Sequence, residues 1–146
     1  FTKMSKGVLA KYKEEYGNVY QKGALIGLCL DLYLRSETNG RYGTQQLIRD
    51  LSARFGPDKS FADDDLFKLI AETTQVKGIE QFFSHYVSGS KELPLATLLS
   101  KVGCELRSID GKKDKVAFLD AMKQEFKEII NPSPAQLQLR QAWMNP

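Results

Sequence analysis

The sequence predicts an all-α fold of about eight short-to-medium antiparallel helices around one central apolar helix, Tyr20–Arg35. Apolar residues recur at helical spacing along most of the chain, and no stretch sustains the period-two alternation of a half-buried strand. Glycine, proline or capping residues separate the helical segments. At most one short strand is expected, in the stretch "CELRSI" that begins at Cys104.

The first half of the chain contains four of the expected helices. The first covers 3–15 and is broken at Gly17. Asn18 then caps the central helix, with Gln21 three residues later in a relative of the capping box. The third helix, "TQQLIRDLSARF", has leucine, isoleucine and phenylalanine on one face and ends at a glycine and a proline. The fourth follows "SFADDD", whose acids suit the positive end of a helix dipole.

The second half contains the other four. The fifth helix, "GIEQFFSHYVSG", and the sixth, which opens near Pro94, each have one apolar face and end at glycine. The candidate strand and the charged loop "DGKKDK" follow. A seventh helix is expected over Val116–Ile130. The eighth begins at Ser133 and Pro134, with Gln136 at the third position, which is typical of a capped helix start.

The composition and charge of the chain argue against a nucleic-acid partner and against a membrane partner. The 146 residues contain 21 lysines and arginines against 18 aspartates and glutamates, and the net charge of +3 is spread along the chain. This charge is too weak and too diffuse to indicate a nucleic-acid partner. The longest apolar stretch, Gly23–Leu30, is far shorter than the roughly 20 residues that cross a bilayer, and no leader precedes it. We therefore expect a soluble protein without a membrane partner, either cytoplasmic or periplasmic. Because the chain begins with Phe1, we expect it to be part of something longer.

Few residues offer catalytic chemistry. A zinc site needs three or four suitably spaced ligands, whereas this chain has one histidine, His85, and two separated cysteines, Cys29 and Cys104. Neither cysteine has a local context that would lower its pKa and make it a nucleophile. The acids of 63–65 could hold a cation, although acids at a helix start are explained by the helix dipole alone. We expect no zinc site, no metal cofactor and no peptidase activity in this chain by itself.

The central helix has one face of small residues. Tyr20, Gly23, Ala24, Gly27 and Asp31 stand at i, i+3, i+4, i+7 and i+11 and so share one side of the helix. Another backbone can approach this side closely, because glycine and alanine leave room.

Two interpretations of Tyr20 stay open on this pattern. Near the positive end of the helix dipole, its phenol could donate a hydrogen bond to an anion. Alternatively, Tyr20 is a core aromatic, Lys22 is a solvated charge and Asp31 pairs with Arg35 one turn later.

Four segments in order resemble a known family. They are "VYQKGALIGLCLDLYLR", "TNGRYGTQQLIRDL", "FADDDLFKLI" and "IEQFFSHYVSGSKELPLATLLSKVG", and they cover about 4–106 without large gaps. The first is similar to the tyrosine-x-lysine-glycine segment of thermolysin-like zinc aminopeptidases. Together they resemble the helical C-terminal part of the catalytic domain in the glycyl aminopeptidase family, whose members usually also carry a PDZ domain.

The resemblance implies a role for one residue. In such enzymes the tyrosine of this motif donates its hydroxyl to the oxyanion of the tetrahedral intermediate, and the matching position is Tyr20. The family's zinc ligands belong to an H-E-x-x-H helix and a later glutamate, neither of which occurs here. The chain would then be one wall of the active-site cleft, with zinc only in the parent enzyme. Its partners would be the remainder of the catalytic domain and a peptide substrate.

The resemblance also sets the expected division of the chain. Residues 1–106 would be a helical subdomain of the catalytic domain, and 107–146 a helical extension packed on it as one structural unit. The 30 residues of 104–133 are too few for a PDZ domain. Two alternatives remain: a non-catalytic helical protein-interaction module with an exposed apolar patch, and a basic helical domain that touches nucleic acid, which the interspersed acids argue against.

Overall fold

The computed structural model of the chain describes residues 7, 16–108 and 124–145. This part is mostly helical, with one two-stranded sheet, so the prediction of a mainly helical protein is confirmed. It contains six α-helices where the sequence suggested about eight in the whole chain. The helix expected over 3–15 lies outside the described residues.

The longest helix, α2, covers Tyr16–Glu37. It therefore begins two residues before Asn18, and the predicted cap at Asn18 is wrong. Gly17 lies within the helix as well, because one glycine costs a helix interior only about 1 kcal/mol, which is too little to end it.

Among the described residues, helix α2 is buried along its second half and more exposed along its first. Ile26, Cys29, Leu32 and Leu34 belong to the hydrophobic core, whereas the side chain of Tyr20 is exposed. The expectation of a central helix that is apolar and buried nearly all round is not met. No helix in the described ranges combines the length and the apolar character that crossing a bilayer would require.

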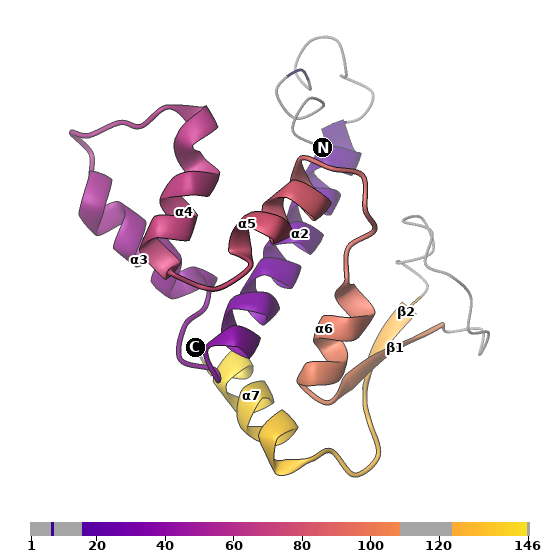
Figure 1. Cartoon of the computed structure of the whole chain (residues 1–146). Helices are drawn as coiled ribbons and strands as arrows, with labels where there is room; N and C mark the ends of the chain where they lie inside the picture. Colours follow the sequence, from indigo (N-terminus) through magenta and orange to yellow (C-terminus); the bar gives the residue numbers. More distant parts are fainter. Residues whose placement is uncertain (1–6, 8–15, 109–123, 146) are drawn as a thin grey trace.

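Two further helices lie on one side of α2 (Figure 1). Helix α3, Thr44–Phe55, has the bounds that the sequence predicts and ends at Gly56, whose positive φ of 56° suits glycine. The acids that precede the fourth expected helix form a 3₁₀ turn, η2, Asp63–Asp65, and α4 follows over Leu66–Thr74. α3 and α4 pack against each other, and α3 also contacts α2.

The fifth expected helix changes its winding halfway. It consists of α5, Ile79–Phe82, and a π-helical turn, η3, Phe83–Val87. The ring of Phe83 stacks on Phe67 of α4 with 4.4 Å between the centroids. The ring of Phe82 packs on Tyr33 of α2 with 5.3 Å between the centroids. The wider turn thus places successive aromatic side chains on both neighbours.

The sheet corrects the sequence prediction at two points. Strand β1, Cys104–Ser108, pairs antiparallel with β2, Gln124–Glu128, so the limit of one strand is wrong. The helix expected over Val116–Ile130 is also wrong over 124–128, and 116–123 lies outside the described residues. A lone strand would leave its backbone N–H and C=O groups unpaired, and cross-strand pairing overrides the weak helical preference of β2.

The closing helix, α7, Pro134–Met144, forms as the sequence predicts. The Ser133 hydroxyl accepts from the Gln136 backbone N–H, and the Gln136 side chain accepts from the Ser133 N–H, which completes a capping box. α7 packs against α2 and α6, Leu95–Lys101 (Figure 1). This packing brings the last turn of α7 onto the C-terminal end of α2.

Arg140 of α7 joins three elements. Its side chain is only 8% exposed; Nε donates to the carbonyl of Val102 at 2.8 Å and Nη2 to that of Gly103 at 2.6 Å. Nη1 forms an ion pair with Glu128 of β2 at 2.6 Å. A Cβ on Gly103 would lie 2.6 Å from the Arg140 guanidinium, so the close approach requires glycine there. Arg140 thus holds α7 to the sheet and to the end of α6.

We expect Arg140→Ala to lower the free energy of unfolding by about 2–4 kcal/mol. The substitution removes a buried cation and leaves the carbonyls of Val102 and Gly103 without their donor. Urea denaturation monitored by circular dichroism measures the change. Arg107→Ala is the matched control, because its ion pair with Glu105 is largely exposed and its removal should cost less than about 0.5 kcal/mol. Equal losses in the two variants would contradict the role given to Arg140.

Candidate functional site

Tyr20 lies on the open first half of α2. The residue is 63% exposed, and its neighbours Gln21 and Lys22 are exposed as well. The interpretation of Tyr20 as a core aromatic is therefore wrong. The structure places the predicted catalytic residue at the surface, on a regular helix that the core holds at its other end.

The small-residue face next to Tyr20 is open in the described part of the chain. Ala24 is exposed, and a Cβ built on Gly27 meets no neighbouring atom within 4 Å among the described residues. Glycine in a helix interior costs about 1 kcal/mol relative to alanine, so packing among these residues does not explain why position 27 is glycine. Close approach of a further backbone would explain it.

The far end of the same face is closed by an ion pair that the sequence spacing indicated. Asp31 Oδ2 accepts from Arg35 Nε at 2.8 Å, and both side chains are largely buried. Asp31 Oδ1 accepts from the backbone N–H of Thr44 at 2.7 Å and from its hydroxyl at 2.9 Å. Arg35 Nη1 donates to the carbonyl of Ala142 at 2.7 Å. The pairing of Asp31 with Arg35 is thus confirmed, and it also holds α3 and α7.

The other candidate residues do not form a nucleophile and base. Cys104 Sγ contacts the carbonyl of Val102 at 3.8 Å, and His85 Nε2 lies 3.4 Å from Lys91 Nζ, so each has a different partner. Cys29 is fully buried, and desolvation raises the pKa of its thiol to about 12. At neutral pH this thiol is therefore uncharged and weakly nucleophilic.

The acidic cluster Asp63–Asp65 lies exposed in η2, before α4. Within residues 7, 16–108 and 124–145, no three histidine, cysteine, aspartate or glutamate side chains are arranged to hold a metal ion. The described residues thus offer no ligand set that fits zinc.

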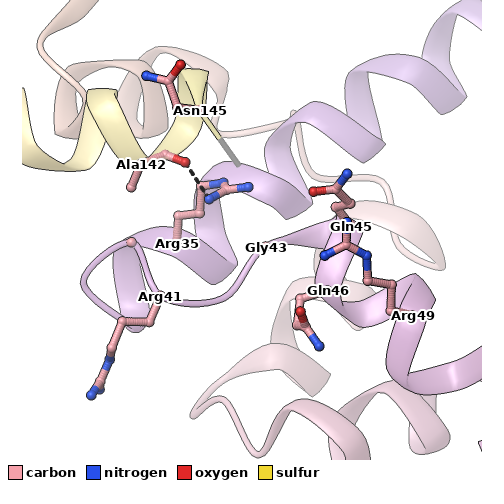
Figure 2. A pocket seen from close by; sticks show the side chains of 9 residues that line it. Arg35, Arg41, Gly43, Gln45, Gln46, Arg49, Ala142 and Asn145 are labelled. Atoms are coloured by element: carbon pink, nitrogen blue, oxygen red, sulfur yellow. Dashed lines mark hydrogen bonds between the residues drawn. The ribbon is translucent and has the colours of Figure 1, made fainter. Parts of the chain in front are cut away.

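A polar pocket that the sequence analysis missed lies at the C-terminal end of α2 (Figure 2). It has a volume of about 140 Å³ and is lined by three arginines and three amide side chains: Arg35, Arg41, Arg49, Gln45, Gln46 and Asn145, together with Gly40, Gly43 and Ala142. These residues come from α2, the turn after it, α3 and the end of the chain. No spacing rule connects them, so only the folded chain reveals the pocket.

We expect Gly27→Ala to raise the free energy of unfolding by about 0.5–1 kcal/mol, because alanine favours the helix and its Cβ meets open space. Thermal and urea denaturation measure the gain. Gly43→Ala is the contrasting variant: its Cβ would lie 2.5 Å from Arg35 Nη2 and 2.6 Å from Asp31 Oδ1, and it should be destabilising. A destabilised Gly27→Ala chain would show that this face is already packed.

Comparison with known proteins gives no assignment: no family model, no curated protein and no solved structure matches the chain. The residues themselves therefore have to support any function. Tyr20 on its open face and the arginine pocket at the opposite end of α2 are the two candidate sites.

Proposed function

We propose that the chain is the helical portion of a zinc metallo-aminopeptidase of the glycyl aminopeptidase type, and that it forms one wall of the active-site cleft. The observation that supports this most is the position of Tyr20. Its exposed side chain lies on a core-anchored helix beside a face of small residues that is open in the described chain. A cleft wall needs this combination of a rigid support and an accessible polar group.

The support for Tyr20 comes from the second half of α2. Cys29, Leu32 and Leu34 are almost completely buried there, and the Asp31–Arg35 pair fixes the last turns. A helix held along one half moves as a rigid rod, so its other half keeps its direction. The backbone of Tyr20 therefore has a defined position, which is one part of the pre-organisation that stabilisation of a transition state requires.

The chemistry that we assign to this chain is one hydrogen bond. When water attacks a peptide carbonyl, negative charge develops on the carbonyl oxygen, and the Tyr20 hydroxyl would donate to that oxyanion. Zinc, bound by a segment of the parent enzyme with its own ligands, would polarise the same carbonyl. The exposed ammonium of Lys22 adds positive charge to the same end of α2. The substrate is a peptide, and the partner is the rest of the catalytic domain.

The small-residue face of α2 is the surface on which this partner would pack. Gly27 and Ala24 leave the α2 backbone accessible, so an element of the remaining catalytic domain can lie against it. We also propose that 1–106 and 107–146 form one unit. The contacts of Arg140 with Val102 and Gly103, and of Arg35 with Ala142, support that arrangement.

A second candidate function is a non-catalytic helical interaction module. Its supporting observation is a set of large apolar side chains that are exposed in the described chain: Ile48, Phe126, Ile130, Leu137 and Met144. Exposed apolar side chains mark a protein-binding surface where they gather into one patch, so this alternative predicts that at least some of the five lie together. This alternative requires no role for the Tyr20 hydroxyl, and that difference separates the two functions experimentally.

We expect Tyr20→Phe in the intact enzyme to reduce kcat on the order of 10²-fold or more, with KM changed much less. The change removes one oxyanion donor, worth roughly 3 kcal/mol in the transition state, and keeps the ring. The stability of the chain should stay within about 0.5 kcal/mol, because the residue is exposed. Steady-state hydrolysis of a peptide substrate gives both constants.

Tyr33→Phe provides the control for this experiment. The Tyr33 hydroxyl donates to the carbonyl of Lys77 at 2.9 Å, so its removal should reduce stability and leave kcat unchanged. Wild-type turnover in the Tyr20→Phe enzyme would contradict the catalytic proposal and favour the interaction module.

A further inference from the structure

The arginine pocket is bounded by four parts of the chain that meet at the end of α2. Arg35 comes from α2, Arg41 from the turn after it, Gln45 and Arg49 from α3, and Asn145 directly follows α7. Its volume of about 140 Å³ is several times the roughly 30 Å³ that one water molecule occupies in the liquid. The pocket therefore has room for a small ligand.

The arginines that line the pocket differ in how they are held. The Arg35 side chain is 6% exposed and is fixed by Asp31 and by the carbonyl of Ala142. Figure 2 shows the Arg49 side chain turned towards Gln45, across the space from Arg35, whereas the Arg41 side chain points away from them. Arg35 thus faces the pocket from α2 and Arg49 faces it from α3, and Arg41 contributes positive charge at its rim.

The charge around the pocket is not balanced. Asp31 is paired with Arg35 and also accepts from Thr44, whereas Asp50, next to Arg49 in α3, accepts only from the neutral Gln46 amide and the Tyr42 hydroxyl at 2.7 Å and keeps its charge.

No aspartate or glutamate is among the lining residues, and Arg41 and Arg49 form no ion pair with the described residues. Arg35 is compensated by Asp31, and Arg41 and Arg49 together face the single charge of Asp50, so one positive charge remains in excess. Gln46 already donates to Asp50 and Asn145 to the Gln141 carbonyl, so the donors left for an oxyanion are the guanidinium of Arg49 and the amide of Gln45.

We propose that this pocket binds a dianionic phosphate group, as inorganic phosphate or as a phosphate monoester. The excess of positive charge favours an anion, and planar guanidinium groups bind phosphate oxygens with two parallel hydrogen bonds, a geometry that suits phosphate. Arg35 lies fifteen residues beyond Tyr20 on α2, roughly 22 Å along the helix axis. The pocket is therefore separate from the proposed cleft wall, and the phosphate site does not depend on the peptidase function.

The test is a titration of the 146-residue chain with inorganic phosphate at constant ionic strength, with sodium chloride as the reference salt. A five-atom ligand of ordinary efficiency predicts a Kd of about 1 mM. Amide resonances of 45–49 in nitrogen–proton correlation spectra should shift in a saturable manner, and Tm should rise with phosphate. Arg49→Gln should weaken binding by at least about tenfold, because it removes a charged donor. Arg54→Gln removes the same charge from an exposed site on the same helix and should leave the affinity unchanged.

Three results would overturn the proposal. The first is the absence of saturable shifts at 45–49. The second is an equal affinity in the wild-type and Arg49→Gln chains, which would show that phosphate acts only as a general stabilising salt. The third is an equal response to acetate at the same ionic strength, which would show that the pocket does not select a dianion. Glycerol phosphate, tested beside inorganic phosphate, shows whether the site admits a monoester.

Discussion

The ion pair between Asp31 and Arg35 connects the parts of the structure that the hydrophobic core alone does not fix. Its two members lie one turn apart on α2, and both are largely removed from solvent. Charges so far buried are stable only when hydrogen bonds satisfy them, and here the partners come from other elements. These partners are Thr44, in the first turn of α3, and Ala142, in the last turn of α7. The positions of α3 and α7 therefore depend on one pair of side chains.

This arrangement divides α2 into an anchored half and an exposed half. The anchored half carries the core residues, the ion pair and the edge of the arginine pocket; the other half carries Tyr20 and the open surface at Gly27. Rigidity at one end is what gives a side chain at the other end a defined position. Both proposed sites follow from the same support: a catalytic donor on the open half, and a phosphate pocket where α3 and α7 meet the anchored half.

The sequence predicts the parts of this fold that depend on local chemistry. The Ser133–Gln136 capping box and the glycine stop at Gly56 each act within a few residues, and both are found. The prediction from sequence fails where pairing between residues far apart in the chain determines the secondary structure. The segment 124–128 resembles a helix locally and becomes a strand because β1 needs a partner. The spacing on α2 leaves two interpretations of Tyr20 open, and only the resemblance of its motif singles it out. The arginine pocket could not be predicted, because its lining residues meet only after α2, α3 and α7 have packed.

The most direct test of this account is amide hydrogen exchange on the Asp31→Asn chain. The substitution keeps the shape of the side chain and leaves the Arg35 cation buried without its counter-charge, a loss on the order of 3–5 kcal/mol. We predict that protection falls together in α3, from the Thr44 amide onward, and in the last turns of α7, while β1 and β2 stay protected. Unchanged protection in α7, or a loss confined to α3, would show that the ion pair does not hold the two helices jointly.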